Sequence, residues 1–267
     1  MKIFVVSIFL LAFTPLGFAQ SLGGPATGMA EAGVAQRDAW STFYNVGGIA
    51  WVKHTTLVAG YENRFGFSEG LHAAGVGLVK PMGFGTASLS VYRFGDELYS
   101  EDQIALGFGH QVSQFSFGFR LSGYQYHIET VGTRFTSALD VGGIAKLSSE
   151  LTFGMQITNL TQAKKSSFTG ERIPTRLQTG LDYRPAEAVQ LVAEVEHEVQ
   201  EETNVKLGAE YTIREKISLR SGVQTAYFQQ FFGLGLLHRL LQIDYALRNH
   251  TELGMSHQLS LAYKLER

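Results

Sequence analysis

The strongest constraint on the fold is a two-residue alternation of apolar and polar side chains that recurs along most of the chain. In LQIDYALR (241–248), Leu241, Ile243, Tyr245 and Leu247 alternate with polar or small residues. The stretch FSFGFRLS (115–122) follows the same rule with three phenylalanines and a leucine. This period places all the apolar side chains on one face of a β-strand. The pattern therefore predicts a chain built almost entirely of strands, each with one apolar face.

The first residues indicate export. Lys2, the apolar run IFVVSIFLLAF (3–13) and the small-x-small site Gly17-Phe18-Ala19 are typical of a secretory signal peptide, predicted at 1–19. The apolar run is shorter than the roughly 20 residues of a spanning helix. The chain contains no cysteine, which excludes a lipoprotein anchor and a disulfide framework. An exported chain that enters a membrane without helices must form a closed barrel, because hydrocarbon leaves no partner for an unpaired backbone group.

Turn residues divide the alternating part into about fourteen strands, with twelve as the alternative. We place them near 55–63, 71–80, 84–94, 102–112, 114–126, 135–147, 150–159, 174–184, 188–199, 204–213, 216–226, 230–237, 240–248 and 256–265. Each has roughly the ten residues that a tilted strand needs to cross a bilayer. Short turns alternate with longer connections, as expected of periplasmic turns and outer loops. We therefore predict an all-β, transmembrane antiparallel β-barrel over 53–267, located in a bacterial outer membrane.

Glycines gather on the strand face opposite the apolar one. They are Gly60, Gly75, Gly77, Gly107, Gly109, Gly118, Gly142, Gly154, Gly180, Gly208, Gly222, Gly233 and Gly235. Strand glycines often mark the close approach of another backbone, although they also relieve the curvature of a small barrel. Residues 20–52 do not alternate, and 29–40 have a composition that allows short helical turns. This segment is the candidate for a plug inside the lumen.

The segment GGPATGMAEAGVAQRDAWSTFYNVGGIAWV (23–52) closely resembles the N-terminal signature of the outer-membrane family that includes the fatty-acid transporter FadL and the secretion-associated protein PorV. In that family the stretch reads Gly-Met-Gly-Gly-Ala, then Asp with Ala, then Phe-x-Asn-Pro-Ala-Gly-Leu-Ala. Asp38, Ala39, Phe43, Asn45, Gly48 and Ala50 occupy matching positions, whereas Val46-Gly47 replaces Pro-Ala. The resemblance implies a fourteen-stranded barrel with an internal hatch. It also implies hatch or ligand contacts for Asp38, Phe43, Asn45, Gly47 and Gly48.

Charged residues recur on the predicted lumen face. Glu194 and Glu196 are two positions apart in LVAEVEHEVQEE (191–202), so one strand projects both inward. Lys206, Glu210, Arg220 and Asp244 are expected inward on neighbouring strands. We predict that these six residues form a cross-strand charge network. The carboxylates are also suited to bind an ion or to serve in acid–base chemistry. No metal-binding motif is present, so we expect no metal and no other cofactor.

Three functions follow from these features. The resemblance implies passive passage of small hydrophobic compounds, or an adaptor role like that of PorV and PorQ in type IX secretion or surface attachment. A remote alternative is a lipase that uses Ser113 with His110 or Ser256 with His257. Neither pair has a G-x-S-x-G turn or an orienting acid, so we expect no enzyme.

The expected partners are outer-membrane lipid and either a hydrophobic small molecule or secretion-system proteins. The chain has 22 basic and 24 acidic residues, and this balance argues against a nucleic-acid partner.

Overall fold

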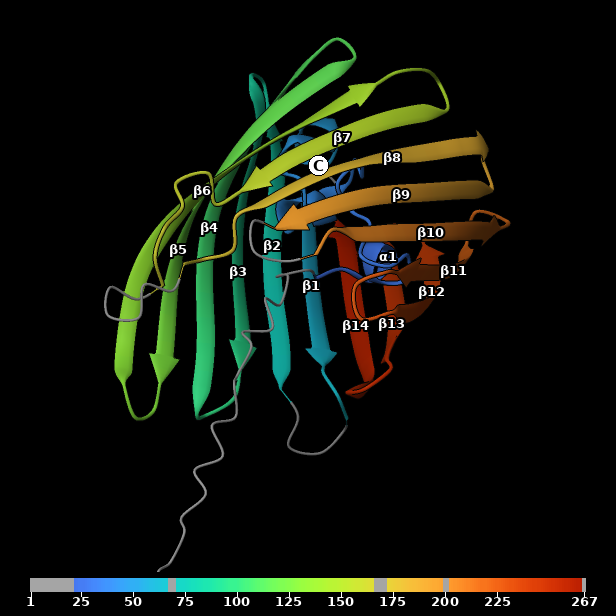
Figure 1. Cartoon of the computed structure of the whole chain (residues 1–267). Coiled ribbons are helices and arrows are strands. Elements are labelled where there is room, and N and C mark those ends of the chain that lie inside the picture. Colours follow the sequence, from blue (N-terminus) through green and yellow to red (C-terminus); the bar gives the residue numbers. More distant parts are fainter. Residues whose placement is uncertain (1–21, 67–70, 166–171, 199–201, 266–267) are drawn as a thin grey trace, which may run out of the picture.

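A computed structural model describes residues 22–66, 71–165, 172–198 and 202–265. The predicted signal peptide, 1–19, lies outside these ranges. Fourteen antiparallel strands close into a barrel in which each strand pairs with its neighbours in sequence and β1 pairs with β14 (Figure 1). In the described part of the chain, helices are too short to cross a membrane. The prediction of an all-β barrel is confirmed.

The strand bounds agree with fourteen strands rather than twelve. They are β1 (Thr56–Asn63), β2 (His72–Met82), β3 (Gly85–Gly95), β4 (Tyr99–Val112), β5 (Phe115–Ile128), β6 (Gly132–Lys146), β7 (Leu151–Thr158), β8 (Arg176–Ala186), β9 (Val189–Glu198), β10 (Asn204–Ile213), β11 (Ile217–Gln224), β12 (Gln229–His238), β13 (Leu241–His250) and β14 (Gly254–Lys264). β4 and β6 each begin three residues before the predicted 102 and 135. Backbone pairing continues at these two strand ends, where Tyr99 pairs with Ile128 and Ile128 pairs with Gly132. The side chains at these ends no longer alternate between apolar and polar.

Connection lengths alternate along the barrel. Residues 83–84, 113–114, 147–150, 187–188, 214–216 and 239–240 form short turns at one end, which we call the short-turn end. The opposite end carries the 159–175 connection and is called the long-connection end. This arrangement is the outer-membrane pattern of short periplasmic turns and longer outer loops.

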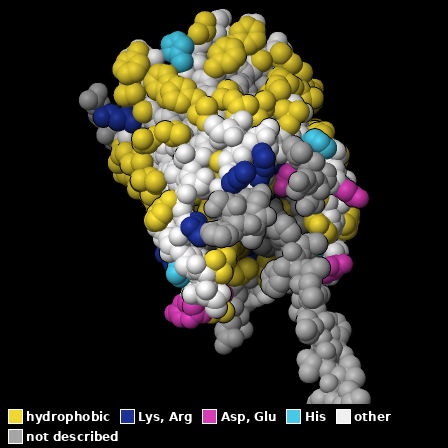
Figure 2. Space-filling model, turned by 60° about the vertical axis from the view of Figure 1, so that its left-hand side comes forward, with side chains coloured by type: hydrophobic (Ala, Val, Ile, Leu, Met, Phe, Trp, Pro, Cys, Tyr) yellow, Lys and Arg dark blue, Asp and Glu magenta, His cyan; other side chains and the backbone are white. Residues whose placement is uncertain are grey.

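The barrel wall is apolar outside and polar inside. Phe117, Leu106 and Leu259 project outward and are more than half exposed, whereas Asp244 and Ser260 project inward and are almost fully buried. In Figure 2 hydrophobic side chains cover much of the upper part of the outer wall. A water-soluble barrel would show the opposite polarity, so this outer surface is a lipid-facing wall.

Residues 22–52 lie inside the barrel, and we call them the inner segment (Figure 1). It contains a four-residue helix, α1 (Gly24–Thr27), and two 3₁₀ helices, η1 (Ala39–Thr42) and η2 (Val46–Trp51). The expectation of helical turns across 29–40 is largely wrong, since only the last two residues are helical. Ala30 and Glu31 have φ angles of 60° and 59°, which interrupt a right-handed helix.

Candidate functional site

The inner segment spans the lumen from one side of the wall to the other. Its first helix, α1, contacts β12, β13 and β14, whereas η2 contacts β3, β4, β5 and β6. Between them, η1 packs against β1, β2 and β3. The apolar side of the segment is centred on Trp40, Val46 and Ile49, each at most 2% exposed. The segment is therefore held by nearly the whole circumference.

The inward glycines make room for this segment. A Cβ atom added at any of the thirteen, except Gly235, would come within 3.1 Å of an inner-segment atom. At Gly118 it would lie 2.7 Å from the Val46 carbonyl oxygen, and at Gly222 it would lie 2.5 Å from the Ala30 nitrogen. Such contacts with backbone atoms leave no space for a side chain. Of the two explanations for the glycines, close approach of another backbone accounts for these positions.

Asn45 links the two halves of the inner segment to the wall. Its side-chain nitrogen lies 2.7 Å from the Val34 carbonyl oxygen, 3.0 Å from that of Gly143 and 3.2 Å from that of Met155. Its Oδ1 accepts a hydrogen bond from the Gly47 N–H at 3.0 Å, which caps η2. The Asn45 side chain is 1% exposed. One amide therefore joins two turns of the segment with β6 and β7.

The other predicted hatch residues also have structural contacts. The Asp38 carboxylate accepts a hydrogen bond from the Trp40 N–H at 2.9 Å and caps η1. Burial raises the pKa of Asp38 to about 6. Phe43 packs against Trp40, with ring centroids 6.2 Å apart. A side chain at Gly47 or Gly48 would collide with backbone atoms, those of Gly143 at Gly47 and the Gln36 carbonyl oxygen at Gly48.

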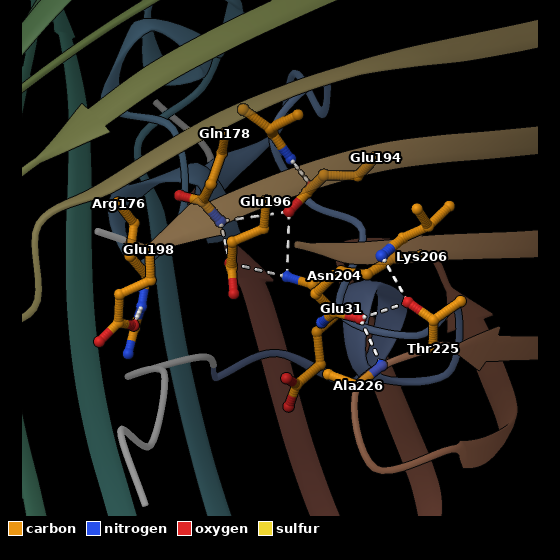
Figure 3. A network of polar contacts seen from close by, with 12 residues as sticks. Glu31, Arg176, Gln178, Glu194, Glu196, Glu198, Asn204, Lys206, Thr225 and Ala226 are labelled. Carbon is orange, nitrogen blue, oxygen red and sulfur yellow. Dashed lines mark hydrogen bonds and ion pairs between the residues drawn. The ribbon is translucent and has the colours of Figure 1, made fainter. Parts of the chain in front are cut away.

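Three of the six predicted lumen charges form one buried group (Figure 3). Lys206 lies between Glu194 and Glu196, with its Nζ 3.0 Å from a carboxylate oxygen of each. The Gln178 amide donates to both carboxylates, at 3.1 and 2.9 Å. The second oxygen of Glu194 accepts from the Val34 N–H at 2.9 Å. This group therefore holds the inner segment as well as the wall.

The remaining three predicted charges form a second group on β10, β11 and β13. Arg220 contacts Glu210 through its Nε and lies 2.7 Å from Asp244 through its Nη1. The Gln242 amide donates to Asp244 at 2.9 Å. All six residues lie on the lumen face, but they form two groups rather than one continuous network.

Two further ion-pair groups were not predicted. Arg248 joins Glu31 of the inner segment, at 3.1 Å, to Glu62 of β1, which also pairs with Arg64 at 3.0 Å. Arg120 pairs with Asp140 at 2.7 Å and donates to the Thr42 carbonyl oxygen at 2.6 Å. Alternation indicates the inward face of Arg120, Asp140 and Arg248. It gives no information on which inner-segment residue each one meets.

The structure does not assemble the serine–histidine pairs of a lipase. Ser256 projects into the lumen and accepts from the Phe65 N–H, whereas the adjacent His257 projects outward to the Tyr245 hydroxyl, 2.6 Å away. His110 lies 2.8 Å from the Phe84 carbonyl oxygen, and among the described residues no hydrogen bond joins it to Ser113. Within the same ranges, no group of three or more His, Cys, Asp or Glu side chains is arranged to hold a metal ion.

No protein-family model matches the sequence, and no curated protein does. Solved structures match over almost the whole chain. The Pseudomonas putida toluene transporter TodX superposes with a TM-score of 0.73 and 11% identity, over 94% of this chain and 100% of TodX. A Pseudomonas aeruginosa FadL homologue gives 0.63 and 12%, over 92% and 98%. The monoaromatic hydrocarbon channel CymD gives 0.63 and 12%, over 93% and 99%.

The chain has the FadL-type barrel fold. The similarity extends over nearly the full length of each compared chain, so it includes the closed fourteen-stranded wall. A FadL-type barrel with an apolar outer wall is an outer-membrane protein. In this FadL-type barrel the lumen holds the inner segment, which is anchored by hydrogen bonds and ion pairs from β3, β5–β7, β9, β13 and β14.

Proposed function

We propose that the protein is a non-enzymatic outer-membrane channel for the passive passage of small hydrophobic compounds, with residues 20–52 as its hatch and residues 53–267 as its wall. The observation that carries the proposal is the inner segment, which fills the lumen of a FadL-type barrel. The structural neighbours TodX and CymD are a toluene transporter and a monoaromatic hydrocarbon channel. A small apolar cargo is therefore the class that the fold supports best.

Passage through this lumen requires the inner segment to move. Its polar anchors to the wall are individual hydrogen bonds and ion pairs, such as the two from Asn45 to β6 and β7 and those of Glu194 and Arg248. Water can replace such contacts when the segment shifts, because each contributes only about 0.5–3 kcal/mol net. The hydrogen bonds between strands do not depend on the segment. In this mechanism Asn45 and Gly47 keep the hatch seated, while Asp38, Phe43 and Gly48 shape its turns.

A reversible disulfide tests this movement, and the cysteine-free chain offers a clean background. The Thr42 hydroxyl of the inner segment lies 3.0 Å from the Ser88 hydroxyl of β3, and both side chains are buried. In Thr42→Cys with Ser88→Cys the two sulfur atoms take the places of these hydroxyl oxygens, and a local shift of about 1 Å brings them to the roughly 2.05 Å of a disulfide bond. Protein reconstituted in vesicles would be assayed for uptake of labelled toluene and of oleate.

We expect uptake to stop in the oxidised variant and to return when the disulfide is reduced. The cysteine-free parent, treated with the same oxidant, is the matched control. Equal uptake by the oxidised and reduced variants would refute a moving hatch. The adaptor role in type IX secretion stays a prediction from the motif. Co-purification of secretion components, together with no uptake of either compound by the parent, would favour that role.

A further inference from the structure

An apolar groove lies on the lipid-facing side of β2 to β6. It encloses about 690 Å³ and is lined on its outer face by Ala74, Val76, Val91, Ile104 and Phe135. Val76, Val91, Ile104 and Gly123 are direct partners along one row that crosses four strands. Ala74 and Gly123 are the smallest of the outward-facing lining residues, and the hollow lies over them, between the larger side chains. The groove opens onto the hydrocarbon that surrounds the wall.

A charged row borders the groove on the side of the long-connection end. Ala74, Arg93, Asp102 and Gln125 are direct partners across β2, β3, β4 and β5. Arg93 lies 3.4 Å from Asp102, and its side chain is 64% exposed. A guanidinium has five N–H donors in a planar fork, so this single long contact leaves most of them available.

The next row towards the long-connection end adds two outward histidines. His72 lies 2.7 Å from the Tyr61 hydroxyl through its Nδ1, and His127 lies 3.0 Å from the Thr133 hydroxyl through its Nδ1. These bonds orient both rings and leave Nε2 as the second polar atom of each. His72 and His127 flank the two strands that carry Arg93 and Asp102. His72, Arg93 and His127 therefore place side-chain nitrogens on the side of the groove that faces the long-connection end.

We propose that this surface binds one phosphate-bearing lipid of the outer leaflet. An acyl chain fills the hollow between Val76 and Ile104, and the phosphate is held by Arg93 with help from His72 on the adjacent strand. The occupant is a membrane component because the groove faces the hydrocarbon. Its headgroup lies at the long-connection end because this end faces outward in outer-membrane barrels. Arginine matches phosphate through two parallel N–H donors.

Native mass spectrometry with added lipid A tests the proposal. The parent is expected to retain one lipid A molecule. Arg93→Gln removes one charge-assisted contact and should reduce the retained fraction about tenfold. Ala74→Phe fills the hollow that the acyl chain would occupy, and it should reduce the retained fraction by a similar factor. The matched controls are Ala193→Phe, an outward position on β9, and Lys80→Gln, an outward position near the short-turn end of β2. Both should retain lipid A like the parent.

Three results would overturn this assignment. The first is undiminished retention of lipid A by both Ala74→Phe and Arg93→Gln. The second is equal retention of a diacylglycerol, which has acyl chains but no phosphate. The third is a dimer of the chain that Ala74→Phe dissociates, because the groove would then hold a second copy. Heat-modifiable gel migration of each variant shows that its barrel is closed.

Discussion

Gly118→Ala is expected to displace the inner segment from the wall while the barrel stays closed. The added Cβ would lie 2.7 Å from the Val46 carbonyl oxygen and 2.9 Å from the Gly47 nitrogen, whereas ordinary contact begins at 3.4 Å. Residues 46–47 must therefore move by about 0.7 Å. Overpacking of this kind costs about 1–3 kcal/mol. The shift also strains the bonds from Ser116 to the Gly47 carbonyl oxygen and from Trp51 to Ser116, at 2.8 and 2.9 Å.

The assay is maleimide labelling of a single cysteine, Val46→Cys, which replaces a fully buried side chain. If the variant destabilises the seated segment by about 2 kcal/mol, the labelling rate should rise about 30-fold. The matched control is Gly123→Ala on the same strand. Its added Cβ faces outward and comes no closer than 3.6 Å to Ile104. The control should label at the parent rate, because an alanine whose Cβ makes only an ordinary van der Waals contact does not destabilise a strand.

Equal labelling of the two alanine variants would refute the argument that the inward glycines exist to seat the segment. If Gly118→Ala both labels faster and loses heat-modifiable migration, the barrel wall has opened or unfolded. The two readouts thus separate a displaced segment from a damaged barrel.

Three further predictions concern the anchors. Asn45→Ala removes the cap of η2 and leaves the buried Gly47 N–H unpaired. The docked state of the inner segment should therefore be destabilised by about 2–4 kcal/mol, measured by maleimide labelling of Val46→Cys. Lys206→Met leaves the buried Glu194 carboxylate and the part-buried Glu196 carboxylate without their cation and should lower the free energy of unfolding in urea by about 3–5 kcal/mol. Adding Glu194→Gln and Glu196→Gln should restore most of that free energy. The pKa of Asp38 is raised from 3.8 to about 6, so the folded state holds its proton more tightly than the unfolded state. Stability from this group should therefore fall as pH rises from about 4 to about 6, and Asp38→Asn should flatten that slope in thermal melts.

The wall could be predicted from the sequence because alternation is a local property. Which face Phe117 or Leu121 occupies depends only on its position in an extended strand, and both project outward as predicted. Strand ends were less predictable. At Tyr99 and Gly132 the backbone pairing outlasts the apolar pattern, since hydrogen bonding does not require a lipid-facing side chain.

The site could be predicted only as a set of residues. Glu194 and Arg248 were placed inward by alternation, but their inner-segment partners, Val34 and Glu31, are 160 and 217 positions away in sequence. Those contacts depend on how a segment without periodicity docks into a barrel of a particular register. The glycines on the lumen face indicated that another segment of backbone lies close to the wall. It did not show that α1 meets β13 while η2 meets β5.

The anchors of α1 have a consequence for assembly. The N–H groups of Gly23 and Gly24 donate to Gln258 and Ser260 on β14, 235 and 236 positions later in the chain. β14 is also the strand that seals the barrel against β1. The N–H groups of Gly23 and Gly24 therefore lack these two acceptors until the last strand is in place. Sealing the wall and completing the anchorage of α1 therefore depend on the same strand, so a chain that ends before β14 lacks both the β1–β14 seam and these hydrogen bonds.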